Sequence, residues 1–380
     1  MVPFARFMEL ALTHPEVGYY SRSDRVLGEG GDFSTAPRLA PGFNRAVAGT
    51  LASLVDAVGD GHVVVVEVGG GEGDLAAGVL DHWQRTRPNL RERVSYVVLD
   101  VAEGLRTRQA DAIAPFARAG WDVRVAGSSG PYPGAGVFAA DSPVTGIVIS
   151  NELIDALPVH LVDVRGAHPS EAWVSVVRGP DGSARCVESW HSLSEDAAAE
   201  LRFLMGGDDV ERARAFTREG ILELRPAVRS LFELWTTWFE ECVVMTVDYG
   251  DWLAGPFAGA PRDDATGGLV VGGSMDASVL HGRTLRGYHR HQVTRDPYRS
   301  VGRQDLTADV DFRALALHGE ACGLECLLFV PLARFLVAAG EVPPPGAADI
   351  EGAPLAALLD EGGLGGLFKV MLQVRERPAV

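Results

Sequence analysis

The sequence predicts an α/β protein whose core is a doubly wound, mostly parallel sheet. Three apolar runs support this prediction, because each ends in small or polar residues: 63–68, 94–99 and 146–150. The first run is almost entirely β-branched, which is typical of a parallel strand buried on both faces. Strands that alternate with helical segments indicate a parallel α/β core.

The chain divides into four expected segments around this core. They are an N-terminal helical and loop segment, the first part of the core, a mainly helical insertion or cap, and the second part of the core: 1–60, 61–190, 191–240 and 241–380. The last segment includes a long Gly- and Asp-rich loop over 251–285. We expect the N-terminal segment to lie over a ligand site.

Sequence patterns also predict helices and strands outside the three apolar runs. Apolar residues at helical spacing predict an amphipathic helix over 42–58, and a short helix is expected over 3–13. Residues 156–190 are β-rich, whereas 194–239 have a strongly helical pattern whose Trp and Phe side chains should pack the insertion. The core resumes after this segment, with strands expected at 243–247 and 368–374.

A glycine-rich turn, Gly69 to Gly73, follows the first strand and precedes a helix near Asp74, which could cap that helix. Glycines let the backbone approach a ligand closely and adopt positive φ, and the helix N-terminus offers free N–H groups. A strand, a glycine turn and a helix in this order make a ligand site at the carboxyl end of the strand. A plain tight turn is the alternative, since glycine is common in turns.

Two carboxylates beside the turn and one within it indicate which ligand the turn binds. Glu67 ends a buried strand, where a charge is costly unless it is used. Asp100 ends the second strand, where a carboxylate can accept both hydroxyls of a ribose. Glu72 inside the turn would repel the pyrophosphate of NAD, whereas S-adenosylmethionine carries a positive sulfur and no phosphate. The turn therefore favours S-adenosylmethionine.

These segments belong to a set of motifs that runs nearly from end to end of the chain. The motifs are HPEVGYY at 14–20, GDFSTAP at 31–37, EVGGGEGDL at 67–75, SNELIDALP at 150–158, DYG at 248–250, DLTADVDF at 305–312 and LFKV at 367–370. In this order they resemble the MidA-like methyltransferases, which include a mitochondrial assembly factor that methylates a protein arginine. The turn departs from the family at Gly70, Glu72 and Asp74, where Pro, Arg and Thr are usual, and Leu153-Ile154 replaces Phe-Phe.

The resemblance implies a Rossmann-like class I methyltransferase core, S-adenosylmethionine as cofactor and two groups of site residues. The cofactor group consists of Asp32, Ser34, Thr35, Glu67, Gly69, Gly71, Gly73 and Asp100. Asp32, Ser34 and Thr35 would lie in a loop folded over the cofactor, although simple turn chemistry is the alternative.

The acceptor group consists of Asn151, Glu152 and Asp155, which follow the third core strand. Glu152 would hold a guanidinium through paired, charge-assisted hydrogen bonds or take up the proton lost on transfer. Its alternative role is to cap a helix from 153 to 157. Asp155 follows near one helical turn later, so it would share the same face as Glu152 or form a structural pair.

Other polar residues are given structural roles, and no metal is expected. Asp309 and Asp311 precede a helix over 312–317, and a capping role is preferred to a metal pair. His289 and His291 are expected in an exposed loop. The four cysteines form no C-x-x-C pair and are interpreted as small buried thiols: Cys186, Cys242, Cys322 and Cys326.

Composition limits the partners. Acidic residues outnumber basic ones by 51 to 34, which gives a formal charge of −17 and argues against nucleic acid as a partner. No signal peptide and no apolar stretch long enough for a membrane span is visible, so a cytoplasmic location is expected. A homodimer is one expectation for the assembly.

Three classes of function stay open at this point. The first is methylation of an arginine of a partner protein, which predicts an open acidic cleft beside Glu152 and Asp155. The second is methylation of a small metabolite, which predicts a closed, largely apolar pocket roofed by 194–239. The third is a non-catalytic assembly protein that keeps the fold, and a nicotinamide dehydrogenase is a more distant alternative.

Overall fold

The computed structural model describes residues 1–21, 35–59, 61–127, 145–207, 210–214, 217, 220–252, 284–289, 292–341 and 353–375. The elements before residue 130 are β1 (Val2–Pro3), α1 (Phe4–Thr13), the 3₁₀ helix η1 (Tyr19–Ser21), α2 (Ala36–Leu39), α3 (Pro41–Ala57), β2 (Val63–Val68), α4 (Asp74–Thr86), the 3₁₀ helix η2 (Pro88–Glu92), β3 (Val94–Leu99), α5 (Glu103–Arg118) and β4 (Asp122–Ala126).

The elements of the middle part are β5 (Thr145–Asn151), β6 (His160–Asp163), β7 (Ser170–Arg178), β8 (Ala184–His191), α6 (Glu195–Met205), α7 (Val210–Arg214), β9 (Ile221–Leu224), α8 (Ala227–Trp238) and β10 (Glu241–Asp251). The last part contains β11 (Arg286–His289), β12 (Gln292–Thr294), β13 (Asp305–Thr307), β14 (Val310–Asp311), α9 (Phe312–Ala321), β15 (Glu325–Pro331), α10 (Leu332–Ala338), α11 (Ala353–Leu359), α12 (Leu364–Leu367) and β16 (Phe368–Arg375).

The main sheet has the strand order β15-β16-β10-β5-β2-β3-β4, with β14 paired to β10. The central strands β3, β2, β5 and β10 run parallel, and β16 runs antiparallel between β10 and β15. The order of the strands along the chain reverses between β2 and β5. This switch point is where open α/β sheets bind ligands. The α/β prediction is confirmed.

Strand β2 shows why the sheet is covered on both faces. Val63 and Val65 pack in one core cluster with residues of α3 and α4, whereas Val64 and Val66 pack in another with residues of α8 and α9. Because side chains alternate along a strand, a run of valines supplies both clusters at once. The β-branched run therefore places β2 in the centre of the molecule.

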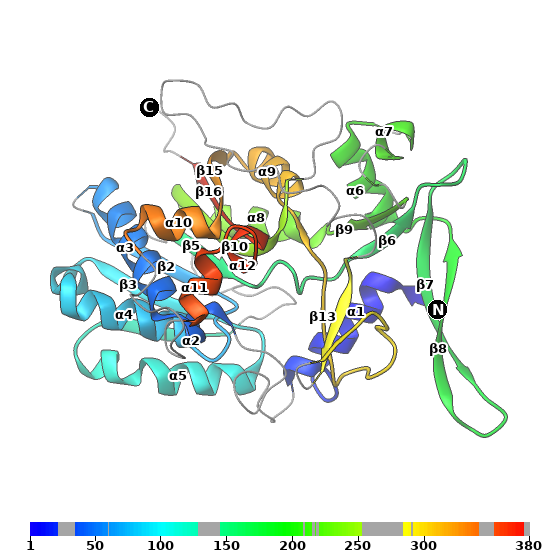
Figure 1. Ribbon diagram of the computed structural model, residues 1–380, viewed down its shortest axis with the longest axis horizontal. Helices are drawn as coiled ribbons and strands as arrows, with labels where there is room; N and C mark the ends of the chain where they lie inside the picture. The colour runs from blue at the N-terminus through cyan, green and yellow to red at the C-terminus, as the bar shows by residue number, and fades with distance from the viewer. Residues whose placement is uncertain are drawn as a thin grey trace.

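A smaller sheet contains β1, β7, β6, β9 and β8, and lies to one side of the main sheet (Figure 1). The β7–β8 hairpin extends outward from it, and α1 lies between this sheet and β13 (Figure 1). Residues of α1, β6, β7 and β13 share one apolar cluster. The N-terminal helix is thus held by packing against two small sheets, beside the main one.

The segment expected to be a helical insertion has a different organisation. It contains strand β9, which pairs with β6, and helix α8, whose Phe232, Trp235 and Trp238 pack against the main sheet. The expectation that its aromatic residues pack an insertion is wrong for these three residues, because their helix covers a face of the core. The division at 191–240 stays a prediction.

Two further expectations concern the loops and the thiols. Of the expected loop at 251–285, only 251, 252, 284 and 285 are among the described residues. Cys242 is buried, whereas the other three cysteines are half-buried, so the expectation of buried thiols holds for Cys242 alone. No helix in the described part of the chain is long and apolar enough to cross a membrane.

Candidate functional site

A cavity of about 490 Å³ opens at the switch point, beyond the carboxyl ends of β2, β3 and β5. Its walls come from six parts of the chain: the N-terminal segment with α1 and Tyr20, Thr35 with α2, the end of β2 with the glycine turn, residues 100–105, residues 151–160, and the starts of α6 and α8. Within the described residues, acidic side chains outnumber basic ones on these walls. They are Glu9, Glu67, Glu72, Asp74, Asp100, Glu152 and Asp196, against Arg6.

The glycine turn has the conformation that its sequence predicts. Gly69, Gly71 and Gly73 have φ values of 73°, 54° and 90°, a region that favours glycine. At Gly70 the constraint is space, since a Cβ would lie 2.4 Å from Val98 Cγ1. Gly73 occupies the N-cap of α4, so the expectation that Asp74 caps this helix is wrong.

Glu67 reaches the cavity from the end of β2. Its side chain is 2% exposed, and the hydroxyl of Tyr96 donates to Oε2 at 2.6 Å. Burial raises the pKa of Glu67 to about 8, although the Tyr96 hydrogen bond lowers it. Glu67 has no cationic partner in the described part of the chain, so a positive ligand group would stabilise its carboxylate.

Asp100 lies at the end of β3, also on the wall of the cavity. The N–H of Ala102 donates to Oδ1 at 2.9 Å, and Gln109 Nε2 donates to Oδ2 at 2.9 Å. Burial raises the pKa of Asp100 to about 6 despite these hydrogen bonds. Gln109 also donates to Gly71 O at 2.9 Å, so one fully buried amide joins the turn to the carboxylate.

Glu72 is neutralised within the protein. Its carboxylate pairs with Arg38 of α2 at 2.7 Å and with Arg108 of α5 at 3.3 Å. The argument that Glu72 excludes a pyrophosphate by repulsion is therefore weaker than the sequence indicates. The ion pair instead connects α2 to the glycine turn, which places Thr35, the residue before α2, on the cavity wall.

Glu152 follows β5 with an unusual backbone. Its φ is 50°, a positive value that non-glycine residues rarely adopt. Its N–H donates to Val247 O at 3.0 Å. Residues 152–158 form turns, so the alternative in which Glu152 caps a helix is wrong. Asn151 donates to Glu152 Oε1 at 3.2 Å, while Asn151 Oδ1 is buried with no partner among the described residues.

Burial raises the pKa of Glu152 to about 8, and the neighbouring Asp155 raises it further. The N–H of Ala36 donates to its carboxylate and acts in the opposite direction. Glu152 therefore lies half-buried on the cavity wall, without a cationic side chain in the described part of the chain to pair with it. A cationic ligand group would complete this site.

Asp248 holds the segment that carries Glu152. Its Oδ2 accepts from the N–H groups of Ile154 and Asp155 at 2.9 and 3.2 Å, and its Oδ1 accepts from Tyr249 N–H at 2.9 Å. The hydroxyl of Tyr249 donates to the Asp155 carboxylate. These contacts connect the end of β10 to the turn after β5.

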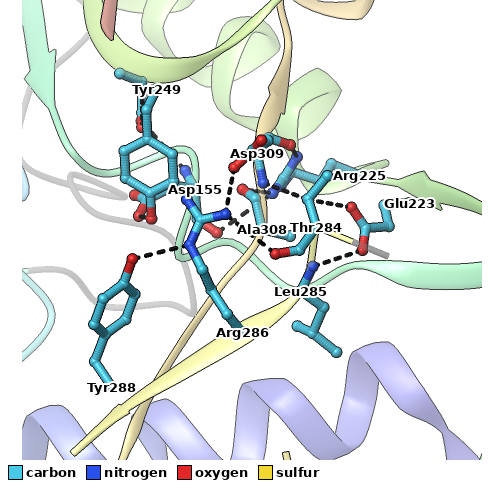
Figure 2. A network of polar contacts seen from close by, with 11 residues as sticks. Asp155, Glu223, Arg225, Tyr249, Thr284, Leu285, Arg286, Tyr288, Ala308 and Asp309 are labelled. Atoms are coloured by element: carbon cyan, nitrogen blue, oxygen red, sulfur yellow. Dashed lines mark hydrogen bonds and ion pairs between the residues drawn. The ribbon is translucent and has the colours of Figure 1, made fainter. Parts of the chain in front are cut away.

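Figure 2 shows how Arg286 completes this network. Its Nη1 pairs with Asp309 at 2.8 Å, and its guanidinium lies over the Tyr249 ring, 4.8 Å from the centroid. Asp155 is buried beside these groups (Figure 2) and pairs with Tyr249. This arrangement corresponds to the structural role considered for Asp155, not to contact with an acceptor.

The structure brings most of the predicted site residues together. Thr35, Glu67, Gly69, Gly71, Asp100, Asn151 and Glu152 line the cavity. Gly73 shapes the turn, and Asp155 lies in the network behind it. Asp32 and Ser34 lie outside the described residues.

Asp311 caps α9 as expected, accepting from Arg313 and Ala314, whereas Asp309 pairs with Arg286. His289 ends β11, which replaces the exposed loop expected there, and His291 lies outside the described residues.

Sequence reasoning missed three residues that the structure places at the site. Gln109 lies in α5, where the sequence analysis considered no site residue, and only the fold shows that its side chain is buried. Tyr20 lines the cavity and donates to Asp305 Oδ1 at 2.9 Å, a partner 285 residues away. Asp248 lay within a recognised motif, but its carboxylate had no assigned role.

Residues 46–330 match the model of a family of S-adenosyl-L-methionine-dependent methyltransferases. The chain belongs to this family. The methyltransferase is 24% identical over 328 residues to the protein arginine methyltransferase NDUFAF7 of Danio rerio, covering 83% of this chain and 67% of the relative. It is 25% identical over 345 residues to the NDUFAF7 homologue of Drosophila melanogaster, covering 85% and 67%. These relatives confirm the MidA-like assignment.

A solved structure agrees with the same assignment. A superfamily member from Burkholderia thailandensis, described as a "likely methyl transferase" and bound to S-adenosyl-homocysteine, is 26% identical and has a TM-score of 0.73. The alignment covers 100% of this chain and 89% of that one. The Rossmann-like methyltransferase core and the enzyme class are therefore confirmed.

The cavity fits S-adenosylmethionine on its own chemistry. Among the described residues, its buried Glu67 has no cationic partner and its Asn151 Oδ1 is an unused acceptor, and the Asp100 carboxylate stands on its wall at the end of β3. Glu67 and the turn would hold the charged end of the cofactor, and Asp100 the ribose. The methyltransferase uses S-adenosylmethionine as cofactor.

Proposed function

We propose that this methyltransferase transfers a methyl group to the guanidinium of an arginine in a partner protein. The observation that carries the proposal is Glu152, a half-buried carboxylate on the wall of the cofactor cavity with no cationic partner in the described part of the chain. A guanidinium matches it, because its planar N–H groups form paired, charge-assisted hydrogen bonds with a carboxylate. The Danio and Drosophila relatives are named as protein arginine methyltransferases, which supports the same acceptor.

The chain's own residues perform three tasks in this reaction. Glu152 orients the guanidinium, and Asn151 offers a side-chain oxygen that accepts no hydrogen bond among the described residues. Asp248 fixes the turn that carries Glu152. The bound cofactor supplies an electrophilic methyl group on a sulfonium. Positioning of the acceptor nitrogen in line with that group accounts for much of the rate enhancement in such sites.

The acidic lining of the cavity favours a protein acceptor over a small apolar metabolite. The metabolite hypothesis predicts a closed, largely apolar pocket roofed by 194–239, and Ser194, Asp196, Pro226, Ala227 and Ser230 do line the cavity. Carboxylates nevertheless reach the cavity from α1, β2, β3 and the turn after β5, which a small apolar acceptor would leave without a partner. A basic peptide segment would meet complementary charge along this whole path.

The test is methyl transfer from methyl-labelled S-adenosylmethionine to a peptide library in which each member carries one Arg, Lys, His or Gln in a basic context. The expected result is label on arginine, located by mass spectrometry as a 14-Da addition, about the mass of one methylene. Glu152→Gln is the informative variant, and Glu233→Gln on the exposed face of α8 is its matched control. Label that enters only small metabolites, or lysine, would overturn the proposal.

A further inference from the structure

The cavity has a second polar wall, formed by His160 at the start of β6. His160 is 7% exposed and lines the same cavity as Glu152. Its Nδ1 lies 2.6 Å from Glu171 Oε1 on the neighbouring strand β7. Glu171 is fully buried, and the N–H of Ser194 donates to its other oxygen at 2.5 Å. The fold thus fixes the Nδ1 edge of an imidazole that lines the cavity.

The hydrogen bonds decide which nitrogen carries the proton. Burial raises the pKa of Glu171, but the hydrogen bonds from His160 and Ser194 outweigh burial and hold it below its ordinary value. An ionised carboxylate can only accept, so Nδ1 of His160 is the donor. The neutral ring then has its lone pair on Nε2, which has no hydrogen-bond partner in the described part of the chain.

Two other uses of this cluster disagree with its geometry. A Ser-His-Glu nucleophile would need Ser194 and Glu171 on opposite ring nitrogens, yet Ser194 Oγ lies 3.4 Å from the same Nδ1. A metal site would need more ligands, and no group of three or more His, Cys, Asp or Glu residues is placed to hold a metal within the described residues. An imidazole that faces an acceptor cavity with a free lone pair is suited to accept a proton.

We propose that His160, oriented by Glu171, accepts the proton that the acceptor nitrogen releases when it is methylated. This role rests on the proposed function. As the nitrogen–carbon bond forms, the methyl–sulfur bond breaks and its electron pair stays on sulfur. The N–H proton passes to Nε2 of His160, which gives an imidazolium paired with Glu171, and then leaves to water.

The charges that face His160 favour this transfer. Glu171 on β7 contacts the imidazole and would pair with an imidazolium, while Asp196 on α6 and Glu9 and Arg6 on α1 line the same cavity. Arg6 is itself paired with Glu9 at 2.6 Å, which reduces its effect. His160 and Glu152 therefore divide two tasks, since one accepts the proton and the other holds the cationic group.

The first test reads the tautomer directly, without turnover. Long-range ¹⁵N–¹H spectra of the histidine-labelled full chain, with His160 assigned by its absence in His160→Gln, should show a protonated Nδ1 and an unprotonated Nε2. In Glu171→Gln the preference should be lost, because a glutamine amide can donate as well as accept. A wild-type spectrum with the proton on Nε2 would overturn the proposal.

The second test measures kinetics on an arginine peptide that the wild-type chain methylates. His160→Gln should lower kcat by about 100-fold or more, the usual contribution of a general base, while the Kd for S-adenosylmethionine stays within about twofold. The acidic limb of the wild-type kcat–pH profile should disappear with it. Glu171→Gln, which keeps His160, should lower kcat by about tenfold or more. His168→Gln, at an exposed loop position, is the matched control.

The outcomes separate the two proposals. If the wild-type chain methylates arginine but His160→Gln keeps its kcat and its pH profile, the role of His160 is refuted and the proposed function stands. If the wild-type chain methylates no arginine peptide, the proposed function fails and this role of His160 fails with it.

Discussion

At the residue scale, Glu152 shows how an unfavourable conformation is maintained. A positive φ at a non-glycine residue costs about 1–3 kcal/mol and persists where the surroundings over-determine it. Here the N–H of Glu152 is bonded to Val247, and the next residues are bonded to Asp248. With this backbone conformation, Glu152 lines the cavity together with the cofactor turn.

Replacement of Glu152 should therefore affect catalysis and stability in opposite directions. Glu152→Gln should lower kcat/KM for an arginine peptide by about 10- to 100-fold, through loss of a charge-assisted pair. The same variant of the ligand-free protein should be more stable than the wild type near pH 8, by roughly 1 kcal/mol after allowance for solvent screening.

The sign follows from the raised pKa. The folded protein keeps a proton on Glu152 up to a pH of about 8, whereas the unfolded chain releases it near the ordinary value of 4.5. Stability is therefore lost as the pH rises through this window, and the glutamine variant lacks this loss. Urea denaturation of the wild type and the glutamine variant, at pH 5 and at pH 8, measures the stability difference near the two ends of this window. An equal effect of the mutation at both pH values would contradict the assignment.

Gln109 predicts a second residue-scale effect. Gln109→Leu removes both the donor to Asp100 and the donor to Gly71 O. We expect the Kd for S-adenosylmethionine to rise by about tenfold, the equivalent of one or two lost hydrogen bonds. Isothermal titration calorimetry measures it, with Gln292→Leu on exposed strand β12 as control. Unchanged affinity would show that Asp100 needs no such support.

At the element scale, the β2–turn–α4 unit is the part that positions the cofactor. The strand is buried on both faces, the turn uses glycine at each constrained position, and α5 closes over the turn through Gln109. The turn between β5 and β6 forms the acceptor side, and contacts from β10 hold it. The cavity lies between these two turns because β2 and β5 are neighbours in the sheet.

Gly70→Ala tests the packing of this unit. The added Cβ would meet Val98 Cγ1 at 2.4 Å, so the turn or the strand must shift. We expect a loss of about 1–3 kcal/mol in stability and a clear loss of cofactor affinity. Gly49→Ala in α3 is the control, since nothing lies within 4 Å of its Cβ position, and it should be neutral or stabilise by about 0.5–1 kcal/mol. Equal behaviour of the two variants in thermal unfolding would refute the packing argument.

At the scale of the whole molecule, charge and burial act together. The chain has a formal charge of −17, and several of its carboxylates line one cavity. Burial raises the pKa of two of them, Glu67 and Asp100, so a cationic ligand that binds there would displace protons. Ligand binding and proton release are therefore linked in this protein.

This linkage predicts a pH-dependent affinity. Glu67 has a pKa of about 8 and Asp100 of about 6 in the ligand-free protein, so S-adenosylmethionine must compete with protons below these values. The affinity should rise with pH between 6 and 7.5, by up to about tenfold per pH unit for each proton released. Calorimetry in buffers of different ionisation enthalpy counts the protons. The Glu67→Gln variant should lose most of the slope, and a slope that it retains would exclude Glu67 as the source.

The sequence by itself determined the central strand, the glycine turn and the carboxylates at the ends of β2, β3 and β5. These features depend on local periodicity and on the rule that parallel strands present their carboxyl ends at one edge. Only the tertiary structure decided that Glu72 is paired, that Asp155 is buried beside Tyr249 and that His160 meets Glu171. Each of these facts joins residues from different elements, and no local pattern records which side chains the packing of those elements brings within hydrogen-bond distance.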